Sequence, residues 1–233
     1  MTHERVYEHF YRTHRMGGRQ VEGSFPLSDG GGPFGFDIEA AVAFDYLVGA
    51  YEPDVIVETG CHLGDTTHYL ARAYPDVTVH SCDINPVHVD FTRRRTARLP
   101  NCWVRECDSR ALLDEVLAGA ERPLIHLDAH GFEDWPLREE LTAVKNGVVC
   151  VDDFDIGAPG WSYDTYGGVA CGPGLIRALD LNLAGAYVNS TENVYGYPCL
   201  QPGRRAGRAY LVLGDLPDLL RHRKYFSPLA LDS

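Results

Sequence analysis

The sequence predicts an α/β fold with a mostly parallel sheet of seven strands, an antiparallel last strand and helices on both faces. Short apolar runs typical of buried parallel strands alternate with segments whose apolar residues recur at helical spacing. This alternation implies a sheet covered by helices on both sides. The connection between the last two strand-like runs is rich in Gly, Arg and Pro and leaves little room for a crossover helix. The final strand should therefore be antiparallel.

The elements follow in order along the chain. Strands are expected at 54–60, 77–83, 102–108, 123–129, 148–154, near 186–190 and at 209–214. Helices are expected at 37–50, 66–74, after Pro86, and at 109–120, 137–147 and 174–182. Asp65 and Asp108 are expected to cap the helices that follow them, and Gly147 to end the helix that precedes it.

The N-terminal part is compositionally different from the rest. Residues 17–35 contain GG, DGGG and GPFG, which predicts a mobile loop. We therefore divide the chain into an arm over 1–35, serving as a lid or an oligomer contact, and one domain over 36–233. The charged N-terminus lacks the apolar centre of a signal peptide, and no apolar run approaches membrane-spanning length. A cytoplasmic protein is expected.

Composition narrows the class of partner. Hydrophobic residues make up 45% of the chain and charged residues 23%, as in ordinary globular proteins. The formal net charge of −12 argues against nucleic acid as the main partner. It is compatible with a cationic small substrate, although an acidic surface more often serves solubility. The seven cysteines are odd in number and form no C-x-x-C pair, so neither a disulfide framework nor a zinc site is indicated.

A glycine-containing turn follows the first strand. Its sequence is Glu58-Thr59-Gly60-Cys61-His62-Leu63-Gly64. In open α/β sheets ligands bind at the carboxyl ends of the strands, and glycine lets a ligand approach the backbone. The turn differs from the dinucleotide fingerprint G-x-G-x-x-G because Glu58 fills the first glycine position. A carboxylate there would repel a pyrophosphate and could attract the ammonium of a methionine moiety.

The next two strands also end in acids. Asp83 ends the second strand, where an acid commonly binds a pair of ribose hydroxyls. Asp108 and Ser109 end the third and could hydrogen-bond an adenine amine. Asp108 could equally be only a helix cap.

Taken together, E-T-G-x-x-x-G, CDINP and ECDS resemble the cofactor motifs of class I S-adenosylmethionine (SAM) dependent methyltransferases. The resemblance covers roughly residues 36–215 and implies a Rossmann-like fold. It implies that Glu58, Gly60 and Gly64 line the amino-acid end of SAM and that Asp83 binds its ribose. The adenine would be contacted by Ile84, Asp108 and Ser109. A nicotinamide-dependent oxidoreductase is the competing interpretation, and the missing glycine counts against it.

Three further acids follow the fourth and fifth strands. Asp128 ends one, and Asp152 and Asp153 end the other. Adjacent parallel strands would bring these carboxylates together, and at neutral pH they would need protons or a cation. Hard oxygen ligands select Mg²⁺, Ca²⁺ or Mn²⁺, of which we expect Mg²⁺. The alternative is that Asp152 or Asp155 caps a turn and no metal binds.

The segment LDAHGFEDWPLREEL followed by VDDF resembles metal-dependent sugar methyltransferases of antibiotic biosynthesis, of the macrocin O-methyltransferase type. Cephalosporin-hydroxylase-like proteins share this arrangement. The resemblance implies Asp128, Asp152 and Asp153 as ligands and His130 as general base, with Asp128 as the other candidate proton acceptor. The metal would fix a substrate oxygen in line with the methyl sulfonium. The family resemblance and the N-terminal arm also favour a homo-oligomer. His126, in the fourth strand, is interpreted as a core residue.

The loop over 155–174 should line the acceptor pocket. Trp161, Tyr163 and Tyr166 could stack on sugar faces, and Asp155 and Asp164 could pair with ammonium groups. With the net charge, this favours an aminoglycoside of the gentamicin or kanamycin type. The alternative substrate is a neutral macrolide or phenolic glycoside. Alternatively, the aromatic residues only order the loop and do not contact a substrate. A SAM-binding partner without activity and a hydroxylase-like enzyme are the other classes left open.

Overall fold

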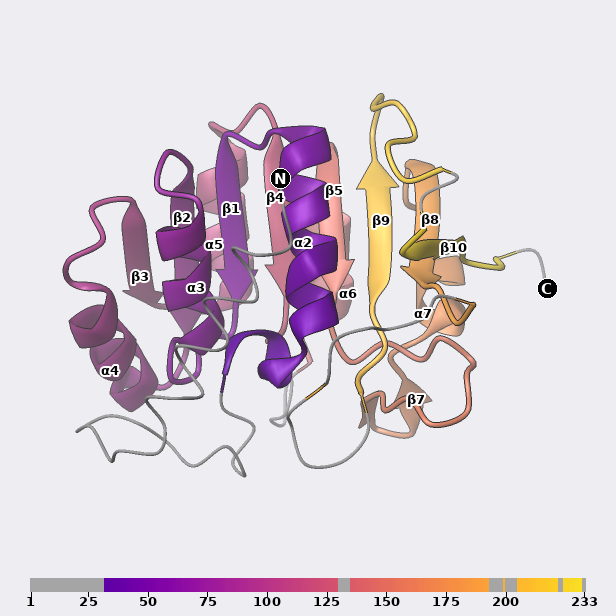
Figure 1. Cartoon of the computed structure of the whole chain (residues 1–233), viewed down its shortest axis with the longest axis horizontal. Coiled ribbons are helices and arrows are strands. Elements are labelled where there is room, and N and C mark those ends of the chain that lie inside the picture. Colours follow the sequence, from indigo (N-terminus) through magenta and orange to yellow (C-terminus); the bar gives the residue numbers. More distant parts are fainter. Residues whose placement is uncertain (1–31, 130–134, 193–198, 200–204, 222–223, 232–233) are drawn as a thin grey trace.

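The computed structural model describes residues 32–129, 135–192, 199, 205–221 and 224–231. Its centre is an eight-stranded sheet in the order β10-β8-β9-β5-β4-β1-β2-β3 (Figure 1). The strands are β1 (Val55–Thr59), β2 (Thr78–Asp83), β3 (Cys102–Glu106), β4 (Pro123–Leu127), β5 (Gly147–Val151), β8 (Leu183–Asn189), β9 (Ala209–Leu213) and β10 (Phe226–Pro228). A separate two-stranded ladder joins β6 (Thr165–Tyr166) to β7 (Val169–Ala170).

Strands β1 to β5 are parallel, whereas β9 is antiparallel to both of its neighbours, β5 and β8. The α/β fold, the mostly parallel sheet and the antiparallel strand over 209–213 are therefore confirmed. Strands β1, β4 and β5 are buried at every position, which explains their continuous apolar runs. The short strand β10, which pairs antiparallel with β8, was not predicted from the sequence.

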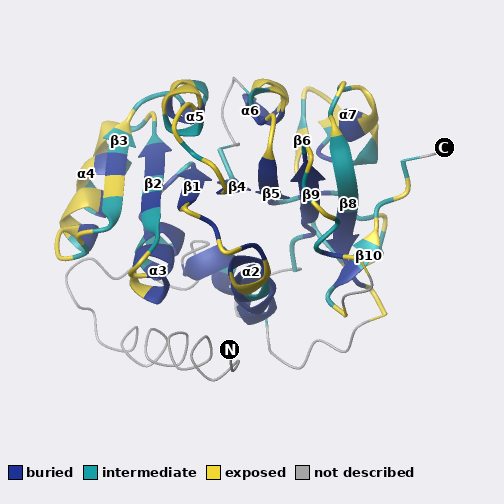
Figure 2. Cartoon of the chain, turned by 90° about the horizontal axis from the view of Figure 1, so that it is seen from above, coloured by how far each residue is buried: buried dark blue, intermediate teal, exposed yellow. Residues whose placement is uncertain are grey.

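Helices cover both faces of the sheet (Figure 2). They are α2 (Ile38–Tyr51), α3 (Asp65–Ala73), α4 (Pro86–Thr96), α5 (Ser109–Leu117), α6 (Leu137–Ala143) and α7 (Pro173–Arg177), preceded by the 3₁₀ turn η2 (Pro33–Phe36). Helices α2 and α3 pack on one face and α5, α6 and α7 on the other, and each face has its own large apolar cluster. Within the described residues, none of the helices combines the length and apolar character that crossing a bilayer requires.

Several predicted element ends are wrong, each for a local reason. Gly64, in the left-handed region, is the N-cap of α3; Asp65 is its first residue and accepts a hydrogen bond from the Gly32 amide. Helix α6 ends at Ala143 because Val144 is extended, so Gly147 instead begins β5 at a φ of 147°. Helix α7 ends at Arg177 instead of extending to residue 182. Asp108 does cap α5, as predicted.

Candidate active site

The candidate site lies at the edge where the parallel strands end (Figure 1). Strands β1, β4 and β5 present their carboxyl ends there. Because β9 runs in the opposite direction, it begins at the same edge, and Val151 pairs with Ala209. This register puts Arg208, the residue before β9, beside Asp152, the residue after β5.

Close packing explains the two glycines of the turn after β1. Gly60 has a φ of 80°, and a Cβ there would lie 2.6 Å from the Asp128 carbonyl oxygen. Gly64 has a φ of 73°, and its Cβ would lie 2.6 Å from Cγ2 of Thr92 in α4. A side chain at either position would strain the backbone and collide with a neighbour. The glycines therefore let the turn sit tightly between β4 and α4, whether or not a ligand is present.

Glu58 is enclosed beside this turn. Its side chain is buried, and its carboxylate accepts hydrogen bonds from the hydroxyls of Thr67 in α3 and Ser81 in β2, the latter at 2.5 Å. Burial raises the pKa of Glu58 to about 7, although both hydroxyl contacts lower it. The carboxylate thus connects β1, α3 and β2, and its expected contact with a methionine ammonium stays a prediction.

Asp83 is held in a fixed orientation at the end of β2. Its Oδ2 accepts the His62 amide at 2.9 Å and its Oδ1 accepts the Asn85 amide at 2.8 Å. The Nδ1 atom of His88 lies 3.2 Å from Oδ2. Next to it, the apolar side chain of Ile84 is 60% exposed. A fixed carboxylate beside an exposed apolar side chain suits a ribose and its attached base.

Asp108 is engaged at the end of β3. It accepts the Arg110 amide at 2.9 Å and the Arg110 guanidinium at 2.8 Å and 2.6 Å, contacts that lower the pKa of Asp108. Its side chain is nevertheless 42% exposed. Ser109, the first residue of α5, is buried. The helix-cap role considered for Asp108 is therefore present, and an adenine contact stays a prediction.

The acids after β4 and β5 lie beside a histidine. Among the described residues, one potential ligand atom from each of His126, Asp128 and Asp152 falls within 4.8 Å of the other two. Nε2 of His126 lies 3.9 Å from Oδ2 of Asp128 and 4.0 Å from Oδ2 of Asp152. His126 is buried, as its strand position predicts, but the sequence did not indicate that it faces the acids. Asp153 is not in this group; its amide donates to Oδ1 of Asp152 at 3.0 Å.

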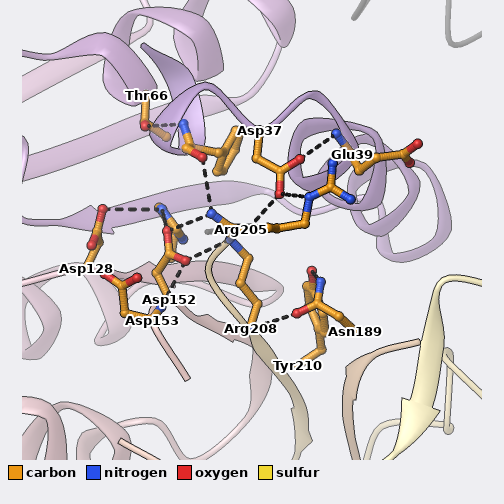
Figure 3. A network of polar contacts seen from close by, with 12 residues as sticks. Asp37, Glu39, Thr66, Asp128, Asp152, Asp153, Asn189, Arg205, Arg208 and Tyr210 are labelled. Carbon is orange, nitrogen blue, oxygen red and sulfur yellow. Dashed lines mark hydrogen bonds and ion pairs between the residues drawn. The ribbon is translucent and has the colours of Figure 1, made fainter. Parts of the chain in front are cut away.

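Arg208, which directly precedes β9, completes the site (Figure 3). Its Nε lies 2.8 Å from Oδ1 of Asp152, and its Nη2 lies 3.1 Å from Oδ2. The guanidinium also donates to the Phe34 carbonyl at 3.2 Å, and its Nη1 lies 3.5 Å from Oδ2 of Asp37. Arg205 contacts the same Asp37 oxygen at 3.0 Å. Two buried carboxylates and two arginines therefore form one network.

The electrostatics of this network favour a charged arginine. Arg208 is only 2% exposed. Burial by itself lowers its pKa, but the carboxylates of Asp152 and Asp37 raise the pKa of Arg208 above the ordinary arginine value. Both oxygens of Asp152 thus have a cationic partner inside the protein. A divalent ion bound to Asp152 would stand next to a guanidinium, and like charges at that range repel. The residues present therefore do not fit the predicted metal.

The predicted acceptor loop is attached to this network. The amide of Ser162 donates to the Arg205 carbonyl and that of Asp164 to the Asp153 carbonyl, both at 2.9 Å. The Trp161 ring lies 5.8 Å from the Arg205 guanidinium, and Tyr166 packs on Trp135 at a ring separation of 5.8 Å. Two of the three predicted stacking residues therefore help to order the loop.

The other predicted acceptor residues differ in accessibility. Tyr163 and Asp164 are exposed. Oδ1 of Asp155 accepts the Gly157 amide at 2.8 Å, a local turn contact. His130, the predicted general base, lies outside the described residues. So does most of the predicted arm; its described end, Gly32–Gly35, includes the buried Phe34.

The comparisons concern the fold. No protein-family model matches the sequence, and no curated protein sequence matches it. Similar solved structures include an O-methyltransferase from Bacillus cereus in complex with SAH (TM-score 0.55, 17% identity, covering 87% of this chain and 90% of that one). Another similar structure is that of TomG, an O-methyltransferase from Streptomyces achromogenes involved in tomaymycin synthesis, in complex with SAM (TM-score 0.53, 17% identity, covering 90% of this chain and 90% of that one). The N-methyltransferase NodS from Bradyrhizobium japonicum has a TM-score of 0.53 and 15% identity (77% of this chain, 97% of that one). The chain has a Rossmann-like methyltransferase fold.

Proposed function

We propose that this protein is a SAM-dependent methyltransferase that methylates a hydroxyl or an amine on a sugar of a natural product. The single observation that carries SAM dependence is the fixed orientation of the Asp83 carboxylate. This carboxylate is oriented by two backbone amides at the end of β2, beside the glycine turn of a methyltransferase fold. An acid at this position suits a ribose, and the turn lacks the first glycine of the dinucleotide fingerprint, whose place Glu58 fills.

The chain's own residues divide the cofactor between them. Asp83 accepts the ribose hydroxyls, the exposed Ile84 packs on the adenine, and the backbone from Gly60 to Gly64 lines the amino-acid end. When bound, SAM supplies a methyl group already activated by a sulfonium, so no protein nucleophile is required. The protein's task is to orient the acceptor and to remove its proton.

Asp128 is the described candidate for accepting that proton. Its side chain is 35% exposed, and its backbone amide is fixed by Oγ1 of Thr59 at 3.2 Å. It therefore combines access from solvent with a defined position at the end of β4. His130 stays the alternative base predicted from the sequence. The proposed reaction uses no divalent ion, because Asp152 is already paired with Arg208.

The acceptor we propose is a cationic amino sugar, with aminoglycosides of the gentamicin or kanamycin type as the leading class. The net charge of −12 supports it, as does the exposed Asp164, whose amide donates to the carbonyl of Asp153, the neighbour of Asp152. A neutral macrolide or phenolic glycoside is the second candidate, which the exposed Tyr163 favours through stacking on a sugar face. We expect neither nucleic acid nor a membrane as partner.

The test is a calorimetric titration of the purified protein with S-adenosylhomocysteine and, separately, with NAD. We expect binding of the first alone. Asp83→Ala should weaken it at least about tenfold, because the ribose loses its carboxylate. Asp90→Ala, which removes an exposed acid of α4, is the matched control and should bind like the wild type. Binding of NAD without S-adenosylhomocysteine would instead support the oxidoreductase interpretation.

A further inference from the structure

We infer that Arg208 is the resident cation of the acid cluster and stands where a divalent ion would otherwise be needed. The three ligand-type side chains His126, Asp128 and Asp152 are close enough to hold an ion. One of the three, Asp152, is instead held by a single buried guanidinium, through an ion pair between Nε and Oδ1 at 2.8 Å and a hydrogen bond from Nη2 to Oδ2 at 3.1 Å. The acid cluster of this chain therefore works with a cation that is part of the protein.

Geometry favours this assignment over an incidental ion pair. The fork of the guanidinium faces the two oxygens of Asp152: Nε forms an ion pair with Oδ1, and Nη2 donates a hydrogen bond to Oδ2. The remaining donors of Arg208 reach the Phe34 carbonyl and Asp37, so the guanidinium is anchored on three sides (Figure 3). A lysine could supply the charge but not this fork.

Hydrogen-bond capacity points the same way. Oδ1 of Asp152 accepts the Asp153 amide and forms an ion pair with Nε of Arg208, and Oδ2 accepts a hydrogen bond from Nη2. An ion bound by Oδ2 would have to use the lone pair that the hydrogen bond from Nη2 leaves free. The oxygen that faces His126 and Asp128 is Oδ2, the same atom that Arg208 contacts. An ion placed there would have to displace the arginine or stand beside it.

Removing the arginine should therefore create a metal site. In Arg208→Gln the cluster keeps its ligand atoms and loses its cation. We expect this variant to bind Mn²⁺ at least about tenfold more tightly than the wild type in calorimetric titrations, and Mn²⁺ to raise its melting temperature. Arg208→Lys, which keeps the charge, should gain no such site. Arg205→Gln removes the neighbouring cation that pairs with Asp37 and is the matched control without gain.

The wild-type protein gives the second measurement, which does not depend on the Arg208 variants folding. We expect the wild type to show no saturable Mn²⁺ binding at this cluster, that is, none that the substitution Asp128→Asn removes. We also expect its turnover to be unchanged by a chelator. Saturable wild-type binding lost in Asp128→Asn would overturn the assignment, as would a folded Arg208→Gln that gains no binding. The assignment rests on the proposed function only in treating this edge as the reaction site. Metal binding and S-adenosylhomocysteine binding are measured separately, so failure of one is distinguishable from failure of the other.

Discussion

At the scale of single residues, the site depends on carboxylates that have very different surroundings. Glu58 is buried between two hydroxyls, Asp83 is oriented by backbone amides, and Asp152 is neutralised by an arginine. The sequence identified all three as strand-end acids, because position along a parallel strand is readable from periodicity. It could not assign their partners, since Ser81, Thr67 and Arg208 come from other elements.

Glu58 makes stability depend on pH. Burial raises the pKa of Glu58 from 4.5 to about 7 in the folded protein, so the folded state holds this proton more tightly than the unfolded state. Stability from this group is present below about pH 4.5 and is lost as the pH rises toward 7. The stability of Glu58→Gln should depend less on pH than that of the wild type. Between about pH 4.5 and pH 7 the free energy of unfolding of the variant should rise by roughly 3 kcal/mol relative to that of the wild type. Urea unfolding at several pH values measures it.

The control for this experiment is Glu121→Gln, which changes an exposed glutamate before β4. Its unfolding free energy should follow that of the wild type at every pH. If Glu58→Gln also runs parallel to the wild type, the buried glutamate does not set the pH dependence.

At the scale of elements, the turn η2 joins parts of the site that are distant in sequence. The Phe34 amide donates to Oγ1 of Thr66 in α3 at 3.0 Å, and its carbonyl accepts from Arg208. Its ring packs against Phe44, Tyr69 and His126, with centroids 5.2 to 5.7 Å away. The sequence assigned this stretch to a mobile arm because of its glycines. That composition reflects a tight turn here: Phe34 and Gly35 both have positive φ.

Phe34→Ala should therefore destabilise the protein strongly. Removing a buried ring leaves a cavity lined by three aromatic rings, at a cost of about 3–5 kcal/mol. Phe91→Ala, which truncates a partly exposed phenylalanine of α4, should cost clearly less. Urea midpoints of the two variants give the comparison. Equal losses would mean that η2 contributes no special packing.

At the scale of the whole molecule, alternation of strands and helices was enough to predict the architecture. The parallel strands, the antiparallel β9 and the coverage of both faces all follow from short-range patterns. Strand β10 was missed because three residues are too few to show a periodicity. The sequence predicted that Asp128 and Asp152 lie together, but it predicted neither His126 beside them nor the arginine that supplies the counter-charge. Arg208 is one of several arginines in the connection before β9, and only the strand register singles it out.

The net charge of −12 makes a prediction at this scale. An acidic surface should speed the encounter with a cationic acceptor, an effect that salt screens over a Debye length of about 10 Å at 0.1 M. For an aminoglycoside, kcat/KM should fall severalfold as NaCl is raised, while the value for a neutral glycoside stays constant. Steady-state assays of both acceptors over a salt series measure this. A preference for the neutral glycoside at all salt concentrations would remove the charge argument for the substrate.

The direction of β9 also has a consequence for how the protein is made. Asp152 and Arg208 are 56 positions apart, and the arginine leaves the ribosome well after the strand that carries the acid has emerged. Until β9 docks beside β5, the Asp152 carboxylate has no guanidinium to share its burial. Docking of this one strand between β5 and β8 therefore joins the two parts of the sheet and balances the charge of the site. A nascent or truncated chain that ends before residue 208 should keep the glycine turn but hold an acid cluster open to water and to passing cations.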